Sequence, residues 1–203
     1  MFHGKPIIGI VGGIGSGKSY IADLFGEFGC HVIKADDLVH EAYASADLKA
    51  KLRSWWGDQV ITPDGQVDRK AVAQRIFGDD PQRQRLEALV HPLVHAARDR
   101  TMARLADTPA VVAFVWDIPL LFEVGLDRQC DAVVFVDCPL QTRLLRVQAS
   151  RGWDHAELKR RENAQLPLDK KRELSQYIIC NTADSAFARR QVEAVISQIF
   201  KKA

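Results

Sequence analysis

The sequence predicts an α/β protein built on a doubly wound, mostly parallel β-sheet. Short apolar runs alternate with segments of helical periodicity along much of the chain, which is the pattern of strands and crossover helices. The first run, residues 7–11, leads directly into a glycine-rich loop. Two nearly continuous apolar runs return at 110–116 and 132–136, as expected of strands buried on both faces. A long helical stretch precedes them, so we expect a helical region inserted into the sheet domain.

The first part of the chain contains two predicted strands and two predicted helices. The β-branched run 7–11 is bounded by glycines, and apolar residues then recur at helical spacing over 19–28 until Gly29. Residues 30–34 predict a second short strand, and residues 38–43 predict a short helix. This order is typical of a strand–loop–helix–strand unit in a parallel sheet.

The middle of the chain has helical periodicity and little strand character. A turn signal at Pro63-Asp64-Gly65 precedes helical stretches at 69–77 and 81–105. We therefore predict a helical insertion in an α/β core. The expected boundaries are 47–107 for the insertion, and 1–46 with 108–203 for the core.

Each of the two returning strands is followed or ended by an aspartate, Asp117 and Asp137. Because open parallel sheets bind ligands at the carboxyl ends of their strands, both carboxylates are expected at the ligand-binding edge. The remaining predicted elements are helices at 139–149 and 155–166, a strand at 177–180, and a closing amphipathic helix at 186–200.

Composition excludes several classes of protein. The 203 residues are 47% hydrophobic and 27% charged, which is ordinary for a globular chain, and the net charge of +2 does not favour nucleic-acid binding. No apolar run approaches the roughly 18 residues of a membrane span, and no leader pattern precedes the first strand. The four cysteines are widely spaced, as in reduced proteins. We predict a cytoplasmic protein without a membrane or nucleic-acid partner. A monomer is the expected state, with an oligomer as the open alternative.

A phosphate-binding motif stands between the first strand and the first helix. Residues Gly12 to Ser19 fit G-x-x-x-x-G-K-S/T, the P-loop, in the strand–loop–helix context that the motif requires. Backbone N–H groups of such a loop and of the following helix bind phosphate oxygens, while Lys18 reaches the outer phosphates and Ser19 binds Mg²⁺. A glycine turn with an incidental lysine is the weak alternative. The predicted ATP-binding residues here are Gly13, Gly15, Ser16, Gly17, Lys18, Ser19 and Tyr20.

The motif alone does not separate a kinase from a GTPase or a mechanical ATPase. An N-K-x-D base-reading motif is missing from the sequence, and the chain is short for a mechanical ATPase. The P-loop NTPase-type fold of this chain therefore favours a small-molecule kinase.

Further segments of the chain resemble the dephospho-CoA kinase family. Residues 9–19 resemble its G-L-T-G-G-I-G-S-G-K-S, and residues 32–36 its V-I-D-A-D. Residues 90–93 follow its H-P-L pattern, residues 117–123 its P-L-L-x-E segment, and residues 178–181 its V-I-D-N strand. The resemblance implies that ATP, with Mg²⁺, phosphorylates the ribose 3′-hydroxyl of dephospho-CoA, the last step of coenzyme A biosynthesis.

The chain departs from the family pattern at several positions. Lys34 stands where the family commonly has the first aspartate of D-A-D, and Tyr20 where it usually has threonine. A different acceptor, such as a nucleotide, shikimate or a sugar acid, is the nearest rival interpretation. A nucleotide-binding regulatory module without turnover is the rival of another class.

Three carboxylates are candidates for the chemistry. From its position, Asp36 either faces the ligand or caps the following helix, and the resemblance favours a catalytic role toward the ribose hydroxyl or Mg²⁺. We expect Asp117, together with Ser19, to bind the metal. Asp137 competes for that role but is more typical of a strand-end turn.

The resemblance also implies an acceptor site and a lid. Acceptor-binding candidates besides Asp36 are Arg69, His91, Pro119, Leu120 and Glu123, although Arg69 and His91 are equally typical of a solvated helix surface. Residues 146–172 carry eight Lys/Arg against four Asp/Glu, which indicates a cationic helical lid or a solvated face. Arg146 and Arg151 are the catalytic lid candidates beside Lys18, and Gln165, Arg160 and Arg161 are weaker ones. Asn181 is predicted beside the adenine, with a turn as the alternative.

Overall fold

The computed structural model describes residues 1–182 and 184–202, and the chain forms two compact units. One unit comprises Met1–Lys34 and Leu105–Ala203, and the other comprises Ala35–Arg104. Sequence analysis set these boundaries at residues 46 and 107. The first boundary lies earlier because helix α2 (Ala35–Ala44) buries Ala42 in the apolar cluster of the helical unit.

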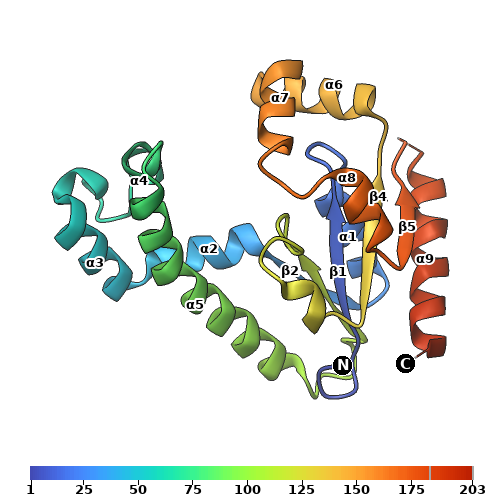
Figure 1. Ribbon diagram of the computed structural model, residues 1–203. Coiled ribbons are helices and arrows are strands. Elements are labelled where there is room, and N and C mark those ends of the chain that lie inside the picture. The colour runs from blue at the N-terminus through green and yellow to red at the C-terminus, as the bar shows by residue number, and fades with distance from the viewer. Residues whose placement is uncertain (183, 203) are drawn as a thin grey trace. The chain divides into compact units, whose positions relative to one another are not determined.

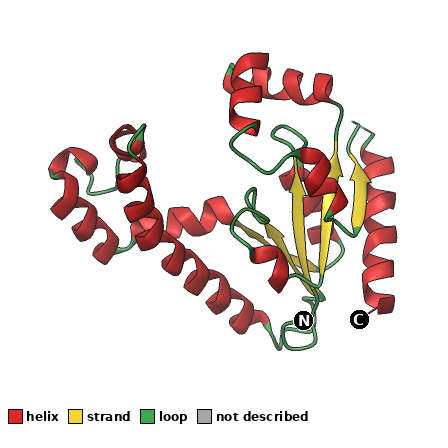
Figure 2. Ribbon diagram, viewed as in Figure 1, coloured by secondary structure: helices red, strands yellow, loops and turns green. Residues whose placement is uncertain are grey.

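The α/β unit contains one five-stranded sheet with the strand order β2-β3-β1-β4-β5, in which all neighbouring strands are parallel (Figures 1 and 2). Non-consecutive neighbours require crossover connections, so the predicted doubly wound fold is confirmed. The strands are β1 (Ile7–Gly12), β2 (Cys30–Lys34), β3 (Ala113–Asp117), β4 (Ala132–Asp137) and β5 (Tyr177–Cys180).

The two faces of this sheet are covered differently. On one face, Ile8 and Ile10 of β1 pack in a cluster with α1 (Lys18–Glu27) and α9 (Ser185–Lys202). Successive strand residues point to opposite faces, so Gly9 faces the other side, where Leu121 is completely buried. A Cβ at Gly9 would lie 2.5 Å from Leu121 Cδ2. Glycine at this position lets the segment after β3 pack closely against the sheet.

Strand register brings the functional candidates of the α/β unit to one edge. Ile10 pairs with Asp117, so the loop that follows β1 begins beside the carboxyl end of β3. On the other side Asp137 pairs with Cys180, the last residue of β5. The carboxyl ends of four strands therefore meet around the P-loop, as expected for a parallel sheet with a ligand at this edge.

The segment after β4 differs from the prediction in its helix boundaries. Helix α6 (Leu140–Arg151) and helix α7 (His155–Glu162) are present, but α7 ends four residues earlier than predicted, with Asn163 at its C-cap. A further helix, α8 (Leu168–Glu173), was not predicted. It begins after Pro167, whose ring cannot continue the preceding helix but whose φ of −51° suits a helix start.

The helical unit has its own apolar core. Besides α2 it contains α3 (Ala46–Trp56), α4 (Arg69–Ile76) and most of α5 (Asp80–Leu105), which continues through Pro92. Asp68 caps α4 by accepting hydrogen bonds from the N–H groups of Lys70 and Ala71. The buried residues of this core are Ala42, Leu48, Leu52, Trp56, Val60, Val72, Leu86 and Val90. Through the described part of the chain, every helix is too short or too polar to cross a membrane.

Candidate active site

The P-loop leads directly into the N-terminus of α1. Helix α1 begins at Lys18, and Gly17 before it adopts φ 86°, ψ 33°, a left-handed conformation that disfavours residues with a Cβ. A Cβ at Gly17 would also lie 2.2 Å from Nδ2 of Asn181. The N-terminal N–H groups of α1 and its dipole are therefore presented to the loop, the arrangement that binds an anion.

We expect Gly17→Ala to lower the free energy of unfolding by about 2–4 kcal/mol, from left-handed strain plus displacement of Asn181. The matched control is Gly125→Ala, because Gly125 has φ 69° and its Cβ would meet nothing within 4 Å. Gly125→Ala should therefore lose stability only through the left-handed backbone strain. Urea denaturation of both variants measures the difference, and equal losses would contradict a close approach at Gly17.

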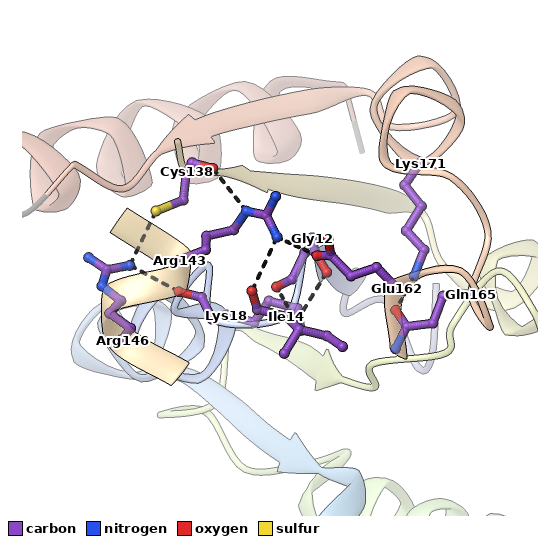
Figure 3. A network of polar contacts seen from close by, with 11 residues as sticks. Gly12, Ile14, Lys18, Cys138, Arg143, Arg146, Glu162, Gln165 and Lys171 are labelled. Carbon is purple, nitrogen blue, oxygen red and sulfur yellow. Dashed lines mark hydrogen bonds and ion pairs between the residues drawn. The ribbon is translucent and has the colours of Figure 1, made fainter. Parts of the chain in front are cut away.

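Lys18 lies folded back on its own loop. Its Nζ donates to the carbonyl oxygens of Gly12 (3.1 Å) and Gly13 (3.0 Å). Figure 3 shows Lys18 beside Gly12. The pKa of Lys18 is lowered from 10.5 to about 8, chiefly by burial. The charge of Asp117 opposes this shift, and the charges of Lys171, Arg151 and Arg143 add to it. A partly buried ammonium that donates to neutral carbonyl groups is poised to bind an anion.

The two predicted metal ligands are in direct contact. Ser19 Oγ donates a hydrogen bond of 2.6 Å to Oδ2 of Asp117, a carboxylate that is only 7% exposed. Within the described ranges, no group of three or more His, Cys, Asp or Glu side chains could hold a metal. This donor set suits Mg²⁺, which prefers oxygen ligands, few of them from protein, and completes its shell with phosphate and water.

Asp137 has a different partner. Its Oδ2 accepts a hydrogen bond of 2.6 Å from Arg172 of α8. The carboxylate beside Ser19 is thus that of Asp117, and metal binding by this pair stays a prediction.

Arg146 and Asn181 both donate hydrogen bonds to the P-loop backbone. Arg146 donates to the carbonyl oxygen of Ser16 (3.1 Å), and Asn181 Nδ2 donates to the same oxygen (2.7 Å). A cavity of about 310 Å³ adjoins these contacts. It is lined by Gly17, Tyr20, Arg146, Asn181, Asp184 and Ser185. The structure therefore brings together four of the sequence-predicted residues around one cavity beside the loop.

Arg143, which sequence analysis missed, is a buried cation that contacts the loop. Its side chain is 7% exposed, donates to the carbonyl oxygens of Cys138 and Ile14, and pairs with Glu162 of α7 (Figure 3). Its spacing of three residues from Arg146 on one helix was the available signal, because such residues share a helix face.

Arg151 takes a different position from Arg146. It is the last residue of α6, and its guanidinium lies 4.7 Å from the centre of the Trp153 ring. Arg161 lies over the same ring at 4.1 Å and, with Arg160, pairs with Glu157. The positive charge of Arg151 helps to lower the pKa of Lys18.

The predicted acceptor residues of the α/β unit follow β3 directly. Pro119 and Leu120 are exposed, whereas Leu121 is buried and anchors the segment on the sheet. The Glu123 carboxylate accepts a hydrogen bond from the N–H of Leu166 and pairs with Lys171. Lys171 was also missed, because a lysine inside a charge-rich run was interpreted as part of a lid or a solvated face.

The other predicted acceptor residues belong to the helical unit. Asp36 is exposed in the first turn of α2, a helix that starts at Ala35. Arg69 lies over the ring of Tyr43 at 5.7 Å, and His91 is exposed and stacked on His95.

The unusual residue Lys34 lies at the end of β2 in the α/β unit. Its Nζ forms an ion pair of 2.7 Å with Asp23 of α1. A carboxylate therefore balances at least part of the charge that Lys34 introduces beside the ligand edge.

Comparisons with known proteins point to one family. The family model described as dephospho-CoA kinase matches residues 6–186. A dephospho-CoA kinase from Syntrophotalea carbinolica is 34% identical over 194 residues, 95% of this chain and 92% of that protein. One from Anaeromyxobacter dehalogenans is 40% identical over 176 residues, 86% of this chain and 83% of that protein.

Solved structures agree with the fold. A crystal structure of a Thermus thermophilus protein superposes with a TM-score of 0.82 at 32% identity, covering 96% of this chain and 97% of that one. Dephospho-CoA kinase from Campylobacter jejuni has a TM-score of 0.65 at 23% identity, with coverage of 96% and 97%. At that identity, this second match supports the fold alone.

Proposed function

The chain belongs to the dephospho-CoA kinase family, and from this premise we propose how its residues divide the work of phosphoryl transfer. It is an ATP-dependent kinase that phosphorylates dephospho-CoA in coenzyme A biosynthesis. The acceptor in our proposal is the ribose 3′-hydroxyl, with CoA and ADP as products. The contact of Ser19 with Asp117 beside the P-loop is the observation that carries the proposal.

The triphosphate of ATP binds along the P-loop backbone and the N-terminus of α1. Lys18 then exchanges the carbonyl oxygens of Gly12 and Gly13 for phosphate oxygens, which stabilises the charge that builds on the transferring group. The cavity bordered by Tyr20 and Asn181 adjoins Gly17 and is large enough for the nucleobase.

Ser19 and Asp117 are the residues that would hold Mg²⁺. When bound, this ion supplies positive charge that neutralises and orients the phosphates. Arg146, already at the loop, and Arg151, at the end of the same helix, are the proposed lid cations, with residues 146–172 as the lid.

The acceptor contacts in this proposal are assigned to residues that the sequence predicted. Lys34 is paired with Asp117 in the strand register, and Asp36 follows Lys34 by two residues in the sequence. Asp36 accepts the proton of the ribose hydroxyl as the oxygen attacks the outer phosphorus. Arg69, His91 and the segment from Pro119 to Glu123 contribute acceptor contacts.

The proposal is tested by ADP release from Mg-ATP with and without dephospho-CoA. We expect strong stimulation by dephospho-CoA and none by shikimate or nucleoside monophosphates, with the new phosphate located on the ribose by phosphorus NMR. Stimulation by another acceptor would support the rival kinase assignment. ATP binding without acceptor-dependent ADP release would support the regulatory module.

The lowered pKa of Lys18 predicts a pH dependence of ATP use. Its free-enzyme pKa is about 8, and ATP binds the protonated ammonium better, so kcat/KM for ATP should fall as the pH rises through about 8. Well above that pH the fall should approach tenfold per pH unit, while kcat changes less because bound phosphates raise the pKa of Lys18. Initial rates from pH 6.5 to 9.5 measure both parameters. Lys18→Arg should show no such fall in its residual kcat/KM, and a flat wild-type profile would contradict the assignment.

A further inference from the structure

Lys171 on α8 is a buried cation without a role in the scheme above. Its side chain is 0% exposed, which distinguishes it from the other lysines of the described chain. Burying an ammonium group is costly unless it is both paired and hydrogen-bonded. The protein retains it inside the α/β unit, so its partners show what it holds in place.

Three oxygen atoms surround the Lys171 ammonium, which has three N–H donors. Its Nζ lies 2.8 Å from Oε1 of Glu123, 3.1 Å from Oε1 of Gln165 and 3.4 Å from the carbonyl oxygen of Pro119. The same Glu123 oxygen also accepts a hydrogen bond of 2.9 Å from the N–H of Leu166. Figure 3 shows Lys171 directed at Gln165, which lies past the end of α7.

These contacts join two stretches that are far apart in the sequence, residues 119–123 and residues 165–171. Pro119 and Glu123 follow the metal-site residue Asp117 at the end of β3, while Gln165 and Leu166 form the connection between α7 and α8. That connection lies within the proposed lid. The network is therefore a direct link between the lid and the segment that presents Pro119 and Leu120.

We propose that Lys171 is a positioning residue for phosphoryl transfer. It holds the segment from Pro119 to Glu123 in a fixed position relative to the lid. This inference rests on the proposed function of that segment. It also gives Glu123 a different task from direct acceptor binding, because its carboxylate is engaged by Lys171 and Leu166. Both residues act through the segment and the lid, without contacting the reacting atoms.

The first test compares Lys171→Met with Lys201→Met. Lys201 is an exposed lysine near the end of α9, outside the proposed lid and the candidate site. Loss of a group that orients a site typically costs about 10–100-fold in activity. We expect kcat of Lys171→Met to fall by about that factor. KM for ATP should stay within about twofold, since the P-loop contacts are untouched, and Lys201→Met should match the wild type. An unchanged kcat in Lys171→Met would overturn the proposal.

A second variant separates positioning from folding. Lys171→Met leaves the Glu123 carboxylate, whose side chain is 20% exposed, without its cation and should lower the melting temperature, whereas Lys171→Met/Glu123→Leu removes both charges and should recover most of it. If the pair positions the segment, kcat of the double variant stays low, because Leu166 and Pro119 have lost their partners. Recovery of kcat together with Tm would show a structural pair and overturn the proposal. Absence of dephospho-CoA-dependent turnover in the wild type would instead contradict the proposed function.

Discussion

Replacing Lys18 with methionine is expected to lower kcat by about 1,000-fold or more. Lys18 is the P-loop cation, and its ammonium already lies at the loop, held by the carbonyl oxygens of Gly12 and Gly13. Methionine fills a similar volume but supplies no charge to the transferring phosphoryl group. Steady-state ADP release at saturating ATP and dephospho-CoA measures the loss.

The matched control for this variant is Lys5→Met. Lys5 also donates to two backbone carbonyl oxygens, those of Leu105 and Thr108, at a place outside the proposed site. If anchoring the backbone were the main role of Lys18, both variants would lose stability with little specific loss of kcat. We expect kcat of Lys5→Met to stay within about threefold of the wild type, and a similar value for Lys18→Met would contradict the phosphate role.

The stability of Lys18→Met provides a second, independent check. The folded-state pKa of Lys18, about 8, lies below its ordinary value of 10.5, so the protonated side chain opposes folding at pH 7. This cost is fully present below about pH 8 and is relieved as the pH rises toward the ordinary value. The methionine variant without nucleotide should therefore melt no lower than the wild type at pH 7, although it is the less active enzyme.

The parts of the fold that sequence predicted are those with a strong local pattern. The run Ile7 to Gly12 is apolar on both faces and leads into a motif whose spacing has few other uses, so strand, loop and helix were all located. The contact between Ser19 and Asp117 follows from the parallel register, which places strand ends at a common edge. These inferences needed no knowledge of distant side-chain packing.

The parts that sequence missed depend on packing between distant segments. Helix α8 has six residues and is rich in charge, so it shows no apolar face by which to recognise it. Lys171 and Lys170 are neighbours on that helix, but the side chain of Lys171 is buried and that of Lys170 is exposed. The partner of Lys171, Glu123, lies far away in the sequence. Arg143 is similar, since its burial depends on the position of Glu162 on the next helix.

The role of Asp36 at the start of α2 could not be predicted from the local sequence pattern either. A carboxylate directly after a strand is compatible with helix capping as well as catalysis, and the sequence cannot decide between them. In the structure α2 already begins at Ala35, so Asp36 lies inside the first turn, with Asp37 beside it. Both carboxylates are exposed, and both lie in the first turn of α2, where the helix dipole acts on them alike. Asp37 is therefore a matched control for Asp36.

Asp36→Asn is expected to lower kcat by about 100-fold or more, because asparagine keeps the size of the side chain but cannot take up the hydroxyl proton. The matched control is Asp37→Asn, which removes the same charge from the same turn. We expect this control to keep kcat within about threefold of the wild type. Both variants should keep the wild-type melting temperature within a few degrees, since exposed side chains contribute little to stability.

Titration of Mg²⁺ in the same assay distinguishes the two roles open to Asp36. If Asp36 handles the proton, the loss in Asp36→Asn persists at saturating Mg²⁺ and the half-saturating Mg²⁺ concentration is unchanged. If Asp36 instead helps to hold the metal, excess Mg²⁺ restores much of the rate, and Asp117→Asn should raise the Mg²⁺ requirement in the same way. A wild-type rate in Asp36→Asn at ordinary Mg²⁺, or an equal loss in Asp37→Asn, would remove Asp36 from the mechanism. The catalytic carboxylate would then have to be sought among the groups at the strand ends, beginning with Asp117 itself.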